Sequence, residues 1–213
     1  MTKPYYQDDW VTIYHGDCLE IDAWLEADVL VTDPPYGMAF VSSWTTQDRP
    51  IANDHDTTTR DKVLAMWGAR PFAVFGTWKA KRPDGIINLL IWDKTDGVGA
   101  GMGDLTSCWG FSHEEIYIQG HWPKRQGRQG SVIRTSTGMA SLASRMKHPT
   151  PKPDGIMHTI ISNAPDGTIA DPFVGSGTTL VAAKSLGRKA IGIEIEERYC
   201  EIAAKRCAQD YLF

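Results

Sequence analysis

The sequence predicts an α/β protein in which a mostly parallel sheet carries helices on both faces. In residues 168–195, a short apolar run is followed by a glycine-containing loop, a helix-like segment and a second apolar run. Residues 28–32 form a continuous, mainly β-branched run, which is typical of a strand buried within a parallel sheet. Ligands of such sheets bind beyond the carboxyl ends of the strands, so the residues that follow each run are the functional candidates.

The remaining elements follow from local periodicity, taken in chain order. Strands are expected at 10–14, 28–32, 71–77, 86–92, 114–119, 168–170 and 190–195. Helices are expected at 19–27, 60–69, 154–162, 180–186 and 196–209. Residues 37–59 show neither period and are expected to form a long loop over the site, while residues 95–103 are glycine-rich and irregular.

Length and composition indicate one ordinary globular domain. A chain of 213 residues buries one good core, so a single domain over residues 1–213 is expected. No apolar run approaches the roughly 20 residues that cross a bilayer, and the polar N-terminus is no signal peptide. A soluble, cytoplasmic protein without membrane contact is therefore expected. The four cysteines are too scattered for a zinc cluster, so free buried thiols are expected and no metal site.

The loop from Asp171 to Thr179 is the first functional candidate. Gly175 and Gly177 let the backbone turn sharply and let a ligand approach, and the following helix start offers unpaired N–H groups. Glu194 follows about 20 residues later at the end of a strand, where an acid usually binds ribose hydroxyls. An ordinary turn and a solvated charge are the alternatives. The order of strand, loop, helix and strand favours a nucleotide-like ligand with a free ribose.

The second candidate is Asp33-Pro34-Pro35-Tyr36, directly after the run 28–32. Two prolines fix φ and remove two N–H groups, so carbonyl oxygens and a carboxylate project rigidly from the strand end. A simple turn is the alternative, but it leaves the flanking acid and aromatic residue unexplained.

The two candidates together indicate methyl transfer from S-adenosylmethionine to an exocyclic amino group. The lone pair of an aromatic amine is delocalised into the ring. If Asp33 and the Pro34 carbonyl accept the two amine hydrogens, the lone pair is freed to attack the sulfonium methyl group. Tyr36 can stack on the target base.

The charge distribution indicates a nucleic-acid partner. A net charge of −4 argues against one, yet residues 116–153 contain no acidic residue. Their basic residues are Lys124, Arg125, Arg128, Arg134, Arg145, Lys147 and Lys152. A basic stretch without acidic residues indicates a surface that binds phosphate groups, and a solvated loop is the alternative. We expect Lys124, Arg125, Arg128 and Arg134 to contact DNA. The eight tryptophans indicate core packing, with some available for base stacking.

The chain resembles the amino-methylating DNA methyltransferases, in particular the permuted (beta) class in which the Asp-Pro-Pro-Tyr motif precedes the cofactor loop. The resemblance rests on residues 16–18, 33–36, 91–94, 113–116, 148–153, 171–179 and 192–199, together with Arg206. It implies a Rossmann-like S-adenosylmethionine-dependent fold with a seven-stranded sheet and one antiparallel edge. It implies Asp17 and Cys18 near the cofactor adenine and Lys152 near its methionine end; an ordinary phosphate-facing lysine is the alternative.

The full cofactor-binding set expected from motif and resemblance is Asp17, Cys18, Asp33, Lys152, Asp171, Phe173, Gly175, Ser176, Gly177, Thr178 and Glu194. Larger members of the family carry a sizeable target-recognition region, whereas here only about 120–147 is available. Recognition of double-stranded DNA then needs a short site, a partner or a homodimer. The small single-domain layout looks like phage or prophage methyltransferases.

Adenine is the expected target base. Methylation of the cytosine ring carbon usually needs a Pro-Cys thiolate, and the chain has none. Among family members an acid at position 33 is associated chiefly with adenine. The flipped base is expected to stack on Tyr36 and on Phe40 or Trp44.

This function has three alternatives. A cytosine amino-methyltransferase stays open. RNA or protein amide methyltransferases usually carry Asn in place of Asp33, with the cofactor loop upstream. A non-catalytic DNA- or nucleoside-binding module would be expected to have lost Asp33 or the loop glycines.

Overall fold

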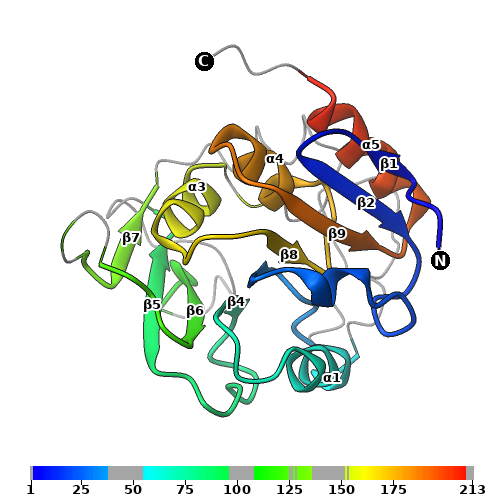
Figure 1. Cartoon of the computed structure of the whole chain (residues 1–213). Coiled ribbons are helices and arrows are strands. Elements are labelled where there is room, and N and C mark those ends of the chain that lie inside the picture. The colour runs from blue at the N-terminus through cyan, green and yellow to red at the C-terminus, as the bar shows by residue number, and fades with distance from the viewer. Residues whose placement is uncertain are drawn as a thin grey trace.

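The computed structural model describes residues 2–37, 55–95, 108–124, 127, 129–135, 152 and 154–209. Within these residues, strands form one mixed sheet in the order β1-β2-β9-β8-β3-β4-β6-β5-β7 (Figure 1). The strands are β1 (Tyr6–Gln7), β2 (Val11–His15), β3 (Val29–Thr32), β4 (Phe72–Gly76), β5 (Asn88–Asp93), β6 (His113–Gln119), β7 (Val132–Arg134), β8 (Ile169–Asp171) and β9 (Ala190–Glu194). The helices are η1 (Ala23–Glu26), α1 (Thr58–Trp67), α3 (Asp154–Asn163), α4 (Thr178–Ser185) and α5 (Glu197–Cys207).

Most of the sheet is parallel. Strands β2, β9, β8, β3 and β4 run in one direction. Strand β6 is antiparallel to both of its neighbours, β4 and β5, and β1 is antiparallel to β2. The carboxyl ends of the parallel strands therefore meet at one edge of the sheet, and the reversed β6 begins at that same edge.

The expectation of seven strands with one antiparallel edge was wrong in two respects. The described residues form nine strands, because short β1 and β7 extend the two sides of the sheet. The side chain of Asp8 accepts bonds from the backbone N–H groups of Trp10 and Val11, which folds the N-terminus back into β1. Strand β7 pairs with the exposed edge of β5, satisfying backbone groups that an edge strand leaves open. The reversed strand β6 lies inside the sheet.

Helices cover both faces of the sheet, as predicted. Val29 and Val31 pack into a core cluster that contains residues of α3, α4 and α5. Leu30, between them, packs into a second cluster with Trp24 of η1 and with α1. This two-residue alternation recurs in β4 and β6, because successive strand side chains point to opposite faces.

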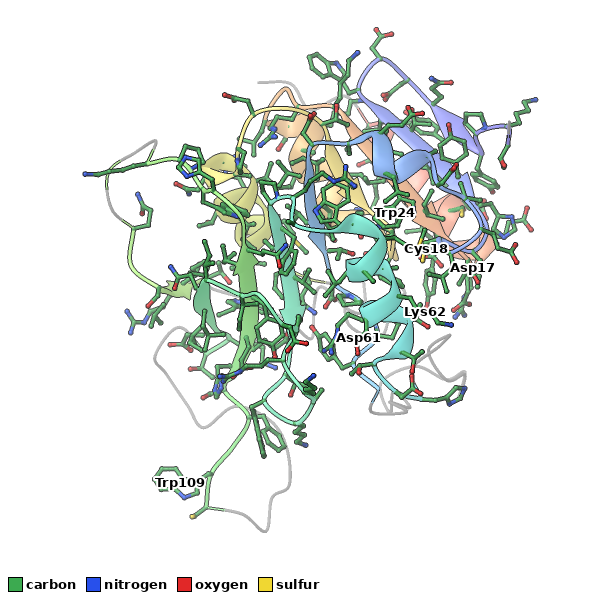
Figure 2. All side chains as sticks on the ribbon, turned by 60° about the horizontal axis from the view of Figure 1, so that its bottom comes forward. Asp17, Cys18, Trp24, Asp61, Lys62 and Trp109 are labelled. Carbon is green, nitrogen blue, oxygen red and sulfur yellow. The ribbon has the colours of Figure 1, made fainter. Side chains whose placement is uncertain are left out.

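The helix expected at 19–27 was wrong in extent, because only η1, a single 3₁₀ turn, forms there. Asp17 explains the difference: its side chain accepts a bond from Leu19 N at 2.9 Å, and its carbonyl accepts bonds from Glu20 N and Ile21 N. Such side-chain bonding favours a turn over a helix start. The indole of Trp24 donates to the Cys18 carbonyl at 2.9 Å, so Asp17 and Cys18 are held beside it (Figure 2).

The other predicted helices and strands match within a few residues. Most of the loop predicted at 37–59 and of the irregular segment at 95–103 lies outside the described residues. Among the described helices, none combines the length and apolar character of a bilayer-spanning segment. Cys18, Cys200 and Cys207 are buried free thiols, whereas Cys108 is exposed, contrary to expectation. The described residues contain no cluster of side chains that could hold a metal ion.

Candidate functional site

Four charged side chains meet at the carboxyl edge of the sheet. Lys152 Nζ lies 2.5 Å from Asp33 Oδ2 and 3.2 Å from Glu114 Oε2. Lys94 Nζ lies 3.2 Å from Glu114 Oε1. We call Asp33, Glu114, Lys94 and Lys152 the charged quartet. Its two carboxylates balance its two ammonium groups, and Lys152 is almost fully buried, with its side chain 5% exposed.

The topology of the sheet brings the quartet together. Asp33 directly follows β3, Glu114 is the second residue of β6, and Lys94 directly follows β5. Because β6 runs against its neighbours, its start lies where the parallel strands end. Glu115 points to the opposite face, where it binds Arg82 and the Tyr117 hydroxyl.

Tyr36 completes this cluster. Its hydroxyl donates to Asp33 Oδ1 at 2.5 Å and lies 3.3 Å from Glu114 Oε2. Lys152 Nζ donates to the same hydroxyl at 3.1 Å. The Pro34-Pro35 turn thus returns Tyr36 onto Asp33, so both oxygens of the Asp33 carboxylate are engaged.

Burial and neighbouring charges set the protonation of the cluster. Burial lowers the pKa of Lys152, but Asp33 and Glu114 outweigh it and hold that pKa above its ordinary value. Burial raises the pKa of Asp33, Lys152 opposes the rise, and Glu114 adds to it. Burial and the two carboxylates raise the pKa of Tyr36 well above its usual range. Lys152 and Tyr36 are therefore donors, and Asp33 is an acceptor with increased proton affinity.

The glycine loop before α4 is pinned by Glu194 at the end of β9. Gly175 N donates to Glu194 Oε2 at 2.7 Å, and Glu196 N donates to Oε1 at 2.8 Å. Gly177 has φ of 87°, and a Cβ there would lie 2.8 Å from that of Ala203. Only glycine fits both the backbone and the space at this position.

The loop is also tied to α5 and to β3. Arg206 Nη1 donates to the Ser176 carbonyl at 2.7 Å and lies 3.2 Å from Thr178 Oγ1. The Thr32 hydroxyl donates to Asp171 Oδ1 at 2.6 Å. Thr32 directly precedes Asp33, so Asp171 connects the glycine loop to the strand that positions the quartet.

Two buried carboxyls of this region have raised proton affinity. Burial raises the pKa of Asp171 to about 6, against bonds that it accepts from Thr32, Thr179 and Phe173. Burial also raises the pKa of Glu194 to about 7, against the backbone donors Glu196 and Gly175. Glu194 is 7% exposed. Its anchored carboxylate can still accept bonds from hydroxyl groups, because a carboxylate has about four lone-pair sites.

The structure sorts the predicted site residues into two neighbouring groups. Asp33, Tyr36 and Lys152 form one, and the glycine loop with Glu194 forms the other. Asp17 lies beside the second group, since Gly16 N bonds to the Glu194 carbonyl at 2.9 Å. The carboxyl groups of Asp171 and Glu194, which end the adjacent strands β8 and β9, thus lie beside the glycine loop.

Of the residues expected to bind DNA, two are described. Lys124 is exposed. Arg134 is also exposed, and its Nε lies 3.4 Å from Asp93 Oδ2. Arg125 and Arg128 lie outside the described residues, as do Phe40 and Trp44, the further stacking candidates.

Sequence reasoning missed the roles of Glu114, Lys94 and Thr32. Glu114 stood within a motif segment but received no function. The alternation of side chains along a strand could have indicated this role, because adjacent Glu114 and Glu115 must face opposite sides of β6. Lys94 lies two residues after the strand predicted at 86–92, near the kind of position that singled out Asp33.

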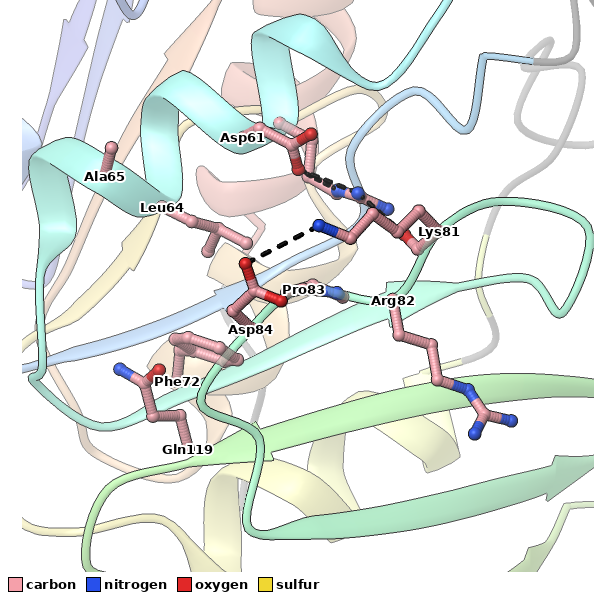
Figure 3. A pocket seen from close by; sticks show the side chains of 10 residues that line it. Asp61, Leu64, Ala65, Phe72, Lys81, Arg82, Pro83, Asp84 and Gln119 are labelled. Atoms are coloured by element: carbon pink, nitrogen blue, oxygen red, sulfur yellow. Dashed lines mark hydrogen bonds and ion pairs between the residues drawn. The ribbon is translucent and has the colours of Figure 1, made fainter.

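A separate concavity of about 340 Å³ lies away from this edge (Figure 3). Its lining includes Phe72, which begins β4, and Gln119, which ends β6. It therefore lies toward the opposite edge from Asp33. Lys81 there lies 3.6 Å from Asp84, and Arg60 binds Asp61. The concavity offers no counterpart of the charged quartet.

Comparison with known proteins identifies similar sequences and folds. A family model described as DNA methylase matches residues 43–205. Type II methyltransferase M.HinfI of Haemophilus influenzae is 46% identical over 256 residues, covering 97% of this chain and 70% of the relative.

Two solved structures share the fold. The crystal structure of the M1.HpyAVI–SAM complex has a TM-score of 0.64 at 23% identity, covering 92% of this chain and 99% of that one. The PvuII DNA methyltransferase, described as cytosine-N4-specific, has a TM-score of 0.65 at 14% identity, covering 100% and 91%. The predicted methyltransferase fold is thus confirmed, with the strand count corrected.

Proposed function

The chain belongs to the DNA methylase family, and on that premise we propose that it transfers a methyl group from S-adenosylmethionine to the exocyclic amino group of adenine in DNA. The observation that carries this proposal is the placement of Asp33, rigidly held at a strand end beside the glycine loop. The Asp171–Thr32 hydrogen bond, at 2.6 Å, joins the two halves of the site.

The chain's own residues activate the amine in this proposal. Asp33 and the Pro34 carbonyl accept the two amine hydrogens, which withdraws the nitrogen lone pair from the ring. Lys152 and Tyr36 already hold the Asp33 carboxylate in place, so little reorganisation is needed. The bound cofactor supplies an electrophilic methyl group on a sulfonium. With the cofactor bound, the nitrogen would form a bond to the methyl carbon as the methyl–sulfur bond breaks and leaves a neutral thioether, and the surplus proton of the nitrogen would leave toward Asp33 or water.

The glycine loop and the strand ends beside it supply the cofactor site in this proposal. Glu194 accepts the ribose hydroxyls, and Asp17 with Cys18 borders the adenine. Asp171, Phe173, Gly175, Ser176, Gly177 and Thr178 shape the pocket. Lys152 was expected at the methionine end; because its ammonium binds Asp33, Tyr36 and Glu114, we assign it chiefly to the amine-activating cluster.

Adenine is favoured over cytosine by the acid at position 33. The fold does not choose between the bases, since the cytosine-N4-specific PvuII enzyme shares it. We further propose that the substrate is double-stranded DNA and that the enzyme acts in the cytoplasm. Residues 120–147 are the proposed target-recognition segment, and a homodimer is one way to enlarge the contact with DNA.

Nucleoside analysis tests this proposal. DNA from cells that express the protein is digested to nucleosides and weighed by mass spectrometry, with Asp33→Ala as the matched control. We expect methyladenine in DNA from cells that express the wild-type protein, and none in DNA from cells that express Asp33→Ala. Cytosine methylated on its exocyclic nitrogen would overturn the base assignment, and the absence of any methylated base would overturn the reaction.

A further inference from the structure

Two aromatic rings and a lysine cluster on the surface outside the charged quartet. Lys79 Nζ lies 4.1 Å from the centroid of the Phe111 ring and 5.8 Å from that of Trp78. The two ring centroids are 6.3 Å apart, with an angle of 36° between the rings. Trp78 is 56% exposed. We call Trp78, Lys79 and Phe111 the aromatic platform.

The platform lies next to the charged quartet at the carboxyl edge of the sheet. Trp78 comes three residues after Phe75, whose ring centroid is 5.1 Å from Lys152 Nζ. Phe111 comes three residues before Glu114, which also binds Lys152. Three residues span at most about 10 Å of chain. Trp78 and Phe111 are therefore each within about 10 Å of chain from a residue that contacts Lys152.

The pairing of β4 with β6 holds the segments of Trp78 and Phe111 together. Strands β4 and β6 are antiparallel neighbours, with Gly76 opposite Glu115. The chain leaving β4 and the chain entering β6 therefore run side by side, which brings Trp78 to Phe111. A single exposed tryptophan needs no explanation. A cation held over two rings beside a reaction site is a more specific arrangement.

The charge of Lys79 is available to a partner. Lys79 is exposed and makes no ion pair within the described part of the chain. Trp109, two residues from Phe111, is 82% exposed on a segment that projects from the body of the molecule (Figure 2). Aromatic faces next to an unpaired cation suit a ligand that has both bases and phosphates.

We propose that the aromatic platform binds DNA beside the target base, with Trp78 stacking on a base that loses its neighbour when the adenine leaves the helix. This inference rests on the proposed function. An intact duplex hides its base faces, but base flipping exposes them next to the reacting nucleotide. Lys79 pairs with an adjoining phosphate. This contact is separate from the basic stretch at residues 116–153.

Trp78→Ala tests the platform, and Trp10→Ala is the matched control. Trp10 is also an exposed tryptophan, 42% accessible, but it directly precedes β2 at the opposite edge of the sheet. Binding is measured by fluorescence anisotropy on two duplexes that contain a mapped methylation site, one fully paired and one with its adenine mispaired. We expect Trp78→Ala to weaken binding of the mispaired duplex by about 5- to 150-fold, the usual range for a lost stacking contact.

Trp78→Phe should restore most of the affinity, because phenylalanine keeps a stacking face, and Trp10→Ala should match the wild type. Lys79→Ala should reduce the log–log salt slope of binding by about 0.9, as expected for one lost phosphate contact. The platform is overturned if Trp78→Ala binds the mispaired duplex as tightly as the wild type. A wild-type protein that binds DNA but transfers no methyl group would instead overturn the proposed function.

Discussion

Lys152 Nζ lies 2.5 Å from Asp33 Oδ2, although 119 residues separate the two in the chain. Tyr36 takes the second oxygen of the same carboxylate. Asp33 is thus held by two donors, and an incoming amine must share one of its oxygens. The contact fixes the direction of the carboxylate and compensates its charge in a buried place. It also makes the ionisation of Asp33 dependent on Lys152.

Removal of this cation should therefore change the pH dependence of the reaction. Asp33 must be deprotonated to accept amine hydrogens, so activity falls as the pH drops through its pKa. In Lys152→Met, Lys94 is the counter-charge that remains to Asp33 and Glu114 among the described residues, and the already raised pKa of Asp33 rises further. We expect the acid limb of kcat/KM to move to higher pH.

Lys152→Arg is the control for that change, because it keeps the charge and should leave the acid limb closer to that of the wild type. Methyl transfer is followed with labelled cofactor from pH 5 to 9. Coincident acid limbs for Lys152→Met and the wild type would show that Lys152 does not set the ionisation of Asp33.

The raised pKa of Glu194 predicts a pH-dependent stability. Its folded value of about 7 exceeds the ordinary value of 4.5, so the folded state binds this proton more tightly than the unfolded chain. The stabilisation is complete below about pH 4.5 and is lost as the pH rises through 7. It amounts to about 3 to 4 kcal/mol at most, since each pKa unit corresponds to about 1.4 kcal/mol.

Urea unfolding of the cofactor-free protein at pH 5 and pH 8 measures this effect. Glu194→Gln should lose less stability than the wild type between these two values. Asp171, with its pKa of about 6, acts in the same direction, so the variant keeps part of the dependence. Equal losses in variant and wild type would refute the role of Glu194.

The glycine loop offers a matched pair of substitutions. Gly177→Ala places a methyl group 2.8 Å from the Cβ of Ala203 and forces φ of 87° on a side-chain-bearing residue. Gly187→Ala meets the same type of backbone strain, with φ of 65°, but has nothing within 4 Å of the new atom. Backbone strain alone costs about 1–2 kcal/mol.

We expect Gly187→Ala to lose about that much stability and to retain cofactor binding. Gly177→Ala should lose more and should bind S-adenosylmethionine at least tenfold more weakly. Thermal unfolding and cofactor titration give both quantities. Similar cofactor affinity in the two variants would argue that the loop at Gly177 does not form the cofactor site.

The basic stretch predicts a salt-dependent contact with DNA. Replacing Arg125, Arg128 and Arg134 with Ala should weaken DNA binding and lower its log–log salt slope by about 0.9 for each lost phosphate contact. Cofactor affinity should stay unchanged. Arg134 also binds Asp93, so Asp93→Asn controls for loss of that ion pair. An unaltered salt slope in the triple variant would place DNA binding elsewhere.

The sequence predicted those parts of the site that local patterns encode. A β-branched run ending at Asp33 placed that carboxylate at the carboxyl edge, because such strand ends meet in a parallel sheet. The glycine loop was predicted for the same reason. The contact of Lys152 with Asp33 was not predictable, since no local pattern tells which distant carboxylate a lysine will meet. The resemblance suggested the methionine end of the cofactor instead.

The fold shows the same division between local and long-range information. Strand β6 was predicted at 114–119, yet its reversed direction inside the sheet depends on pairing with β4 and β5. Strand β7 covers only Val132–Arg134, too short for a periodic signal. The helix at 19–27 was predicted from apolar spacing, but the Asp17 side chain holds the start of this segment in a turn, and only η1 forms there.

Methyl transfer by Asp33→Ala tests the central claim most directly. The variant removes the amine acceptor, while Glu114 remains to compensate Lys152, so the fold should persist. Transfer of labelled methyl groups to DNA is measured at saturating cofactor, with cofactor affinity and thermal unfolding recorded on the same sample. We predict a rate about 100- to 1,000-fold below that of the wild type, with the fold retained. A rate within a few-fold of the wild type would contradict amine activation by Asp33.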